Sequence, residues 1–339
     1  MNANDWIDQL LEVTVIGSFT NIGPAVRGRL FGWEKPPADS LRGRTVLITG
    51  PTSGLGRAAA DALARLGARV VLVGRNAAKL DRVHDELVAV HGEDRFPTVV
   101  ADMGSLGSVR VAVVHILATE ERLDVLVDNA GAIFPERTIG PDGIEATFAI
   151  LAVTPFALVA GLLPLLRRTS GSRVIAVTSG GQYTQGLDLD DVQGMQVDHS
   201  GPKAYARAKR AQVALIREWA RRIPESEVTF HSMHPGWADT PGVEASLPGF
   251  YRFMRPLLRT PEQGADTISF LATADRADLA NGQLYLDRRP RPFDRVRSTR
   301  LSAADRHRIW DIVVGLSGID DPAPDVPAPE AARGSVRHG

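Results

Sequence analysis

The middle of the chain alternates short apolar runs with longer amphipathic stretches. Seven runs rich in Val, Ile and Leu show no polar alternation, and they span residues 45–49, 70–73, 98–101, 124–127, 174–178, 228–233 and 284–286. Runs of this kind are typical of strands that helices bury on both faces. Helix-length segments such as 57–66 and 205–221 lie between them. The pattern therefore predicts βαβ units and one doubly wound, parallel α/β sheet of seven strands.

The N-terminal end does not follow this pattern. Trp6, Ile7, Leu10 and Leu11 form a short amphipathic stripe within residues 1–40. We interpret this segment as an arm that packs on the core or on a partner subunit. Attachment to a membrane surface is a less favoured alternative.

The remaining chain divides into three predicted parts. Residues 41–295 are expected to form the α/β domain. Ser302 and Asp305 resemble a capping box, and apolar residues recur at helical spacing after them, which predicts a C-terminal helix within 296–318. Residues 319–339 are rich in Pro and Ala, and we expect a disordered tail there.

Composition and charge exclude several classes of function. The 39 basic and 40 acidic side chains nearly balance, so nothing favours nucleic acid as a partner. The absence of cysteine excludes disulfides, thiolate catalysis and cysteine-ligated metal, and no metal site is expected. Acidic residues stand where a secretory signal would need positive charge, and a cytoplasmic location is expected.

One segment, residues 146–166, is uncharged and long enough to span a bilayer. It contains Pro155 and Pro164 and lies inside the repeating strand–helix pattern. We therefore interpret it as a buried helix.

A glycine-rich segment, residues 49–56, directly follows the first predicted strand. Gly50 would allow a tight turn, Gly54 a close approach of the backbone to a pyrophosphate, and Gly56 close helix–strand contact. The free N–H groups at the start of the next helix would face the phosphates. The segment predicts a dinucleotide site that includes Gly50, Thr52, Ser53, Gly54, Leu55 and Gly56.

The end of the second predicted strand favours NADP over NAD. An acidic residue there would bind the ribose 2′-hydroxyl, but the chain has Arg75 and Asn76 instead. The Arg75 guanidinium suits a 2′-phosphate and can lie on adenine, and Arg57 adds positive charge nearby. NADP is thus the expected cofactor, with NAD as the alternative.

A second motif predicts proton chemistry. Tyr205 and Lys209 lie one helical turn apart on the same face, where the ammonium would lower the pKa of the phenol toward working pH. Ser179 follows the fifth predicted strand and would lie at the carboxyl edge of the sheet. It can hold a substrate oxygen while Tyr205 transfers the proton.

With these motifs, residues 41–290 resemble the short-chain dehydrogenase/reductase family, and the run 232–243 resembles one subgroup with bacterial members. The resemblance implies a Rossmann fold, with Tyr205 as general acid/base, Ser179 orienting the carbonyl and Lys209 also binding the nicotinamide ribose. It places further cofactor contacts at Asp102, Met103, Asn129, Ala130, Gly131, Pro235, Gly236 and Thr240.

The chain departs from that family's pattern at two positions. Leu151 aligns with an asparagine whose side chain props a helix kink, which frees a carbonyl to hold a proton-relay water. Pro155 could produce the kink instead, because proline lacks the N–H and displaces the carbonyl four residues before it. Asp128 stands where the family usually has an amide, and it adds a negative charge.

The region after the sixth strand predicts a lipophilic substrate. Its apolar side chains would cover a small-molecule pocket or simply pack a lid helix; they are Trp237, Phe250, Tyr251, Phe253, Met254, Leu257 and Leu258. Family resemblance also implies a homo-oligomer through residues 148–166 and 205–221, although burial within one subunit would look similar.

Three functions fit these observations. The favoured one is an NADP(H)-dependent oxidoreductase acting on a carbonyl or alcohol. The first alternative is an NADP-binding sensor or scaffold with little turnover, which Leu151 and Asp128 favour. Sugar-nucleotide modification is less favoured, because no sizeable substrate domain follows Gly282.

Overall fold

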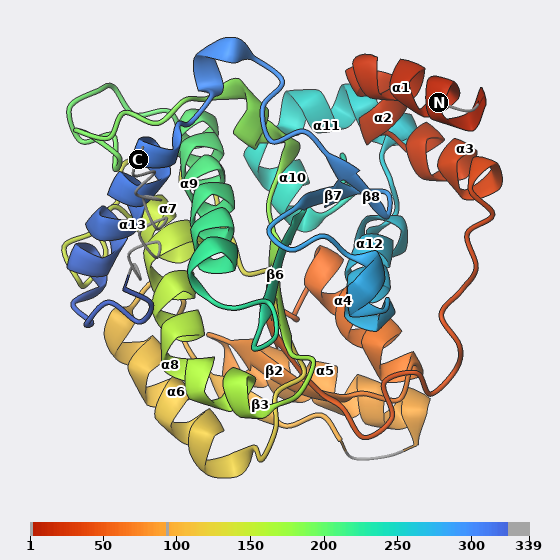
Figure 1. Ribbon diagram of the computed structural model, residues 1–339, viewed down its shortest axis with the longest axis horizontal. Helices are drawn as coiled ribbons and strands as arrows, with labels where there is room; N and C mark the ends of the chain where they lie inside the picture. Colours follow the sequence, from red (N-terminus) through yellow and green to blue (C-terminus); the bar gives the residue numbers. More distant parts are fainter. Residues whose placement is uncertain (1–2, 93–94, 325–339) are drawn as a thin grey trace, which may run out of the picture.

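The computed structural model describes residues 3–92 and 95–324, and within them the centre of the protein is one eight-stranded sheet (Figure 1). Its spatial order is β3-β2-β1-β4-β5-β6-β7-β8. Neighbouring strands from β3 to β7 are parallel, and β8 runs antiparallel to β7. The strands are β1 (Thr45–Thr49), β2 (Arg69–Gly74), β3 (Thr98–Val100), β4 (Val125–Asp128), β5 (Arg173–Val177), β6 (Thr229–Met233), β7 (Leu284–Leu286) and β8 (Arg289–Arg291).

The seven strands expected from the apolar runs all form, with ends shifted by at most one residue. The eighth strand, β8, was not expected. It follows a tight turn in which Asp287 and Arg288 have φ angles of 53° and 59°. Arg291 on β8 pairs with Asp8 near the N-terminus. Because ion pairs rather than apolar burial hold this strand, no apolar run marks it in the sequence.

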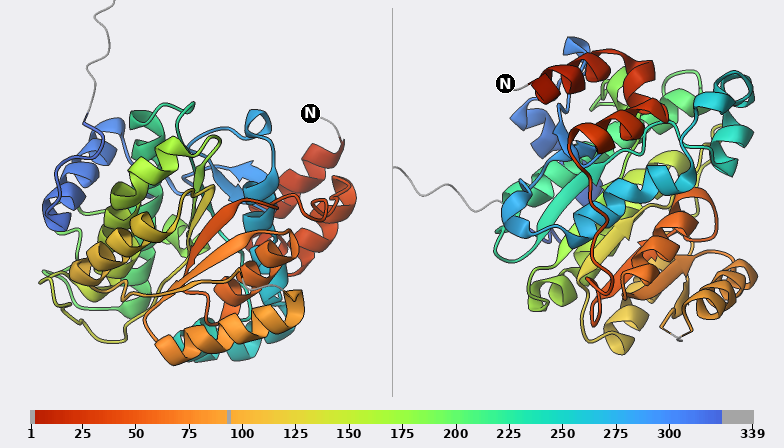
Figure 2. Two further views of the ribbon diagram at one scale, coloured as in Figure 1. Left: turned by 90° about the horizontal axis from the view of Figure 1, so that it is seen from below. Right: turned by 90° about the vertical axis from the view of Figure 1, so that its right-hand side faces the viewer.

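Helices cover both faces of the sheet, as Figure 2 shows. One face carries α6 (Leu106–Thr119), α7 (Ala146–Phe148), α8 (Thr154–Arg168), α9 (Gly201–Arg222) and α13 (Ala303–Ser317). The other carries α4 (Gly54–Arg65), α5 (Ala77–His91) and α12 (Pro261–Thr273). Each layer buries its own apolar core against the sheet, so the doubly wound α/β fold is confirmed.

Shorter helices lie near the carboxyl ends of the strands and along the connections. These are η2 (Gly180–Thr184), α10 (Pro241–Ser246), α11 (Pro248–Met254), η3 (Arg255–Leu257), η4 (Arg276–Asp278) and η5 (Arg297–Thr299). The carboxyl edge of a parallel sheet, where loops from several strands converge, is where such folds bind ligands.

The long apolar segment is a core element, as expected. Ala146–Arg168 is the single described stretch with the length and apolar character to cross a membrane, and 83% of its most apolar window is buried. A π-helical turn, η1 (Ala149–Val153), separates α7 from α8 within it.

The N-terminal arm forms three helices, α1 (Ala3–Val13), α2 (Val15–Phe19) and α3 (Ile22–Leu30), beside β8 and α11 (Figure 1). At the other end, Ser302 and Asp305 form the expected capping box of α13.

The expected disordered tail is described only in part. Within residues 319–324, Asp321 accepts a hydrogen bond from Trp310 and Ala323 is buried, so this part packs on the core and its expected disorder is wrong. Residues 325–339 lie outside the described part of the chain.

Candidate active site

One cavity of about 750 Å³ lies at the carboxyl edge of the sheet. All the site residues that the sequence predicted line it, although strands β1 to β6, with the turns that follow them, and helix α9 supply them from positions far apart in the chain. They are Gly50, Thr52, Ser53, Gly54, Leu55, Gly56, Arg75, Asn76, Asp102, Met103, Asn129, Ala130, Gly131, Ser179, Tyr205, Lys209, Pro235, Gly236 and Thr240.

The glycine-rich turn forms the floor where α4 begins. Gly50 has a φ of +69°, which a side chain would strain. A Cβ on Gly56 would lie 2.1 Å from the Gly50 carbonyl oxygen, so only glycine lets the helix start this close to the turn. Asn129 braces the same turn by donating to the Thr49 carbonyl oxygen at 2.9 Å. The cradle fits a pyrophosphate beside the α4 N-terminus.

Two cations, Arg75 and Lys79, line the cavity next to the end of β2. Both are exposed, and the Asn76 side chain between them caps α5 by accepting from the Lys79 N–H. Arg57, which was expected to add positive charge nearby, forms an ion pair with Glu86 and is not among the residues that line the cavity. Lys79 was missed from the sequence, although a basic residue in the first turn after Arg75 was a usable signal.

Ser179 and Tyr205 meet at the opposite wall. Their side chains are hydrogen-bonded, and the Ser179 oxygen also accepts from the Gly181 N–H at 3.1 Å. Burial raises the pKa of Tyr205 to about 12, and the Ser179 hydrogen bond opposes this only in part. The expectation that Lys209 brings this pKa toward working pH is therefore wrong for this arrangement. A phenol with this pKa is protonated at neutral pH and can donate a proton.

The reason lies in where Lys209 points. Its Nζ donates to the Val177 carbonyl oxygen at 2.6 Å and to Gln212 Oε1 at 3.2 Å. Burial lowers the pKa of Lys209 to about 8, and the charge of Asp128 raises it in part.

Gln212 connects this lysine to Asp128. Gln212 Nε2 donates to Asp128 Oδ2 at 2.6 Å, whereas Asp128 Oδ1 is buried without a hydrogen-bond partner. Burial raises the pKa of Asp128 to about 6, although Lys209 and Gln212 lower it. Asp128 thus reaches α9 rather than bracing a neighbouring strand. Gln212 was missed, although its place three residues after Lys209 puts it on the same helix face.

A second, small cavity of about 20 Å³ adjoins Asp128, Leu151, Pro155 and Gln212. Its volume suits one water molecule, and the unpartnered Asp128 oxygen supplies a polar wall. The rest of the lining is apolar, so Asp128 and Gln212 are the polar side chains that this cavity presents.

The helix beside this pocket is irregular, as Pro155 led us to expect, but the irregularity is a π turn. The Thr154 N–H donates to the Ala149 carbonyl five residues before it. Pro155 has no N–H, so it cannot give the Leu151 carbonyl the hydrogen bond that an α-helix would supply. A proton relay through the Leu151 carbonyl stays a prediction.

The segment after β6 divides between lid and core. Trp237, Val243, Leu247 and Phe250 line the large cavity. The rings of Trp237 and Phe250 contact each other with their centroids 5.1 Å apart. Phe253 faces outward with 83% of its surface exposed. Met254 and Leu258 are buried in the interior. Fewer of the apolar residues between 237 and 258 therefore cover the cavity than the sequence led us to expect.

The arm contributes Phe19 to the rear of this site, which the sequence did not indicate. The Phe19 ring packs on Trp237 at 5.8 Å, and its carbonyl accepts from the Trp237 N–H at 2.7 Å. A Cβ on Gly180, next to Ser179, would lie 2.4 Å from the same ring. The arm is therefore part of the wall that positions the lid.

Comparison with known proteins agrees with this geometry. Residues 44–248 match the family model described as "short chain dehydrogenase". The chain is 35% identical over 277 residues to dehydrogenase/reductase SDR family member 12 of Bos taurus, covering 81% of this chain and 86% of that protein. This is the subgroup that the run 232–243 indicated.

Two further proteins are similar to this chain. A Streptomyces sp. (strain C5) protein named "Putative daunorubicin C-13 ketoreductase DnrU" is 42% identical, covering 83% of this chain and 95% of its own. A solved short chain dehydrogenase from Salmonella enterica is 25% identical with a TM-score of 0.61, covering 74% of this chain and 98% of that one.

Proposed function

Because this chain belongs to the short chain dehydrogenase family, whose members are oxidoreductases acting on CH–OH and C=O groups, we propose that it is an NADP(H)-dependent reductase of lipophilic carbonyl compounds. One observation carries the proposal. The hydrogen-bonded Ser179–Tyr205 pair and Lys209 share a single cavity with the glycine turn and Arg75.

The residues present fit a nicotinamide dinucleotide, which when bound supplies or accepts the hydride. The glycine turn and the α4 N-terminus would hold its pyrophosphate. Ser179 holds the substrate carbonyl oxygen by a hydrogen bond. Tyr205 donates its phenolic proton to that oxygen as the C=O double bond is reduced to a C–O single bond. Burial keeps Tyr205 protonated at neutral pH, which favours the reductive direction.

The preference for NADPH rests on charge. Arg75 and Lys79 present two cations where the adenosine 2′-phosphate would lie, and β2 ends at Gly74 without a carboxylate. A carboxylate at that point would repel the phosphate and bind the free 2′-hydroxyl of NAD.

The lipophilic substrate class rests on the cavity wall formed by Trp237, Val243, Leu247 and Phe250. Apolar walls with a few convergent polar groups are typical of sites for such ligands. The name of the Streptomyces relative specifies a ketone substrate, and a 31% identical Mus musculus relative is named retinol dehydrogenase 14.

The test is NADPH oxidation by the purified chain with a panel of lipophilic aldehydes and ketones. We expect turnover that Tyr205→Phe lowers at least about 100-fold while NADPH binding is retained. Equal turnover in the variant would contradict the role of Tyr205.

A second function has its own support. Leu151 stands where the family has an asparagine, and Asp128 stands where the family has an amide side chain. Because both departures are close to the catalytic residues, the alternative function is an NADP-binding sensor or scaffold with little turnover. NADPH binding by calorimetry without turnover on any carbonyl of the panel would favour it.

A further inference from the structure

Helix α1 presents its acidic face to the protein and its apolar face outward. Asp5, Asp8 and Glu12 recur at i, i+3 and i+7 and form the inner stripe. Trp6, Leu10 and Val13 lie on the opposite side and are 59%, 65% and 80% exposed. A surface helix of a globular protein has the reverse arrangement, with the apolar stripe toward the core.

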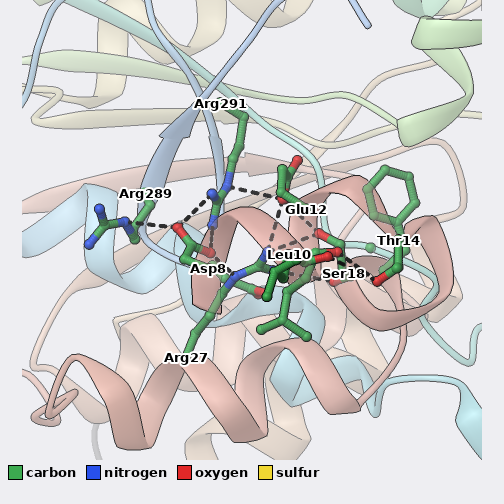
Figure 3. Close-up of polar contacts among 12 residues, drawn as sticks. Asp8, Leu10, Glu12, Thr14, Ser18, Arg27, Arg289 and Arg291 are labelled. Atoms are coloured by element: carbon green, nitrogen blue, oxygen red, sulfur yellow. Dashed lines mark hydrogen bonds and ion pairs between the residues drawn. The ribbon is translucent and has the colours of Figure 1, made fainter. Parts of the chain in front are cut away.

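Arginines fix this orientation. Asp8 pairs with Arg27 at 2.6 Å and with Arg291 at 2.8 Å, and Glu12 pairs with Arg27 at 2.9 Å (Figure 3). Glu12 also pairs with Arg295. The Arg27 and Arg291 side chains are at most 6% exposed. Rolling α1 to bury its apolar side would remove Asp8 and Glu12 from these buried arginines and leave Arg27 with Asp287 as its carboxylate partner. The buried ion pairs therefore hold the apolar side of α1 outward.

The apolar face continues beyond α1. We call it the arm row, and it consists of Trp6, Ile7, Leu10, Val13, Val15, Ile16 and Ile22, all exposed. Large exposed apolar side chains gathered on one short arm mark a surface that another phase or molecule covers.

Exposed arginines surround the arm row. Arg29 lies seven residues after Ile22 and therefore on the same face of α3. Arg252 and Arg255 are exposed on the adjoining α11–η3 segment, which the arm contacts through the Asn21 N–H and the Leu257 carbonyl at 3.0 Å. Within the arm helices and the α11–η3 segment, the exposed charged side chains are these three arginines, which complement an anionic surface.

We propose that the arm row docks on the surface of an anionic lipid bilayer, with its apolar side chains at the headgroup level and the three arginines on lipid phosphates. Helices that lie in the interface combine an apolar face with flanking basic residues in this way.

Docking has a consequence for the cavity. Phe19 belongs to the same arm and packs on Trp237, which lines the cavity. The bilayer is then close to the apolar wall of the pocket, where a membrane-dissolved compound would enter. The docking itself does not depend on the proposed reaction.

The experiment is co-sedimentation of the full chain with vesicles of phosphatidylcholine and phosphatidylglycerol, and with phosphatidylcholine alone. We expect binding to the anionic vesicles and a loss of about tenfold or more in Trp6→Ser/Leu10→Ser. Val111→Ser/Val114→Ser on α6 is the matched control, because these valines are 71% and 68% exposed, and it should bind like the wild type.

Charge is tested separately. Arg252→Gln/Arg255→Gln should weaken binding to anionic vesicles and leave the weaker binding to phosphatidylcholine unchanged. In the unaltered protein, brominated lipid should quench tryptophan fluorescence, and Trp6→Phe should remove most of that quenching while binding persists. This readout does not depend on how the serine variant folds.

Three results would overturn the proposal. They are failure of the wild type to sediment with anionic vesicles, equal losses in the arm and α6 variants, and a dimer by light scattering that Trp6→Ser/Leu10→Ser dissociates without any vesicle binding. The last would show that a second copy covers the arm row.

Discussion

At the scale of single residues, Asp128 is the feature that separates this site from its family's usual pattern. It is buried, reaches Lys209 only through Gln212, and leaves one oxygen without a partner beside a cavity of about 20 Å³. A buried carboxylate with one unpartnered oxygen is costly, and the charge of this one raises the pKa of Lys209, so we expect it to help keep the lysine protonated.

Asp128→Asn should shift the pH profile of turnover. The negative charge of Asp128 raises the pKa of Lys209, which burial lowers to about 8. Without that charge, Lys209 loses its proton at a lower pH, so the alkaline fall of kcat/KM should move down by about one pH unit. Reductase assays between pH 6 and 10 measure this, with Asp102→Asn as a control in the same cavity. An unmoved alkaline limb would contradict the role of Asp128.

Arg75→Ala should weaken the binding of NADPH and leave that of NADH nearly unchanged. Loss of a charge-assisted hydrogen bond to the 2′-phosphate should raise KM for NADPH by about 10–100-fold and leave KM for NADH nearly unchanged. Arg82→Ala, which removes an exposed arginine on the following helix α5, should leave both values as they are. A parallel rise for both cofactors would mean that Arg75 does not read the phosphate.

At the scale of elements, the π turn η1 is the main irregularity near the site. Thr154 stabilises it, because its hydroxyl donates to the Met103 carbonyl at 2.5 Å and to the Ala149 carbonyl at 3.0 Å. π turns inside helices often occur at functional sites. Here the turn places Ile150 in the wall of the large cavity and Leu151 in that of the small one.

Pro155→Ala tests whether the irregular helix supports proton transfer. The new N–H can bond to the Leu151 carbonyl, so we expect a more stable protein and a kcat about tenfold lower with KM unchanged. Pro164→Ala is the control, because Pro164 lies in the same helix, exposed and away from both cavities. Raised stability with an unaltered kcat would leave Pro155 a purely structural residue.

At the scale of the whole molecule, α13 occupies the face on which the family resemblance placed a dimer. Trp310 on α13 contacts Phe156 on α8 at 4.8 Å and Trp219 on α9 at 4.7 Å. The chain therefore buries this face within one subunit. A homo-oligomer, which we still expect by resemblance, would have to use another surface.

Trp310→Ala should lower the free energy of unfolding by about 3–5 kcal/mol, because it opens a cavity among buried aromatic rings. Ile312→Ala on the same helix, which is only partly buried, should cost less. Chemical denaturation measures both. Similar small losses would mean that α13 adds little to the core.

The sequence by itself determined the parts that depend on neighbours along the chain. Buried strands can be recognised in the sequence as apolar runs. The glycine turn occupies eight consecutive residues, and Tyr205 and Lys209 are one helical turn apart. Since parallel strands bring their carboxyl ends to one edge, these local motifs were bound to converge on one cavity.

Only the tertiary structure decided the parts that depend on distant charges. β8, with its Arg-Pro-Arg sequence, forms next to acidic residues of α1 more than 280 positions earlier in the chain. The same pairs turn the acidic stripe of α1 inward and its apolar stripe outward. Periodicity shows that a helix has two faces, but the partners that become buried decide which face points inward.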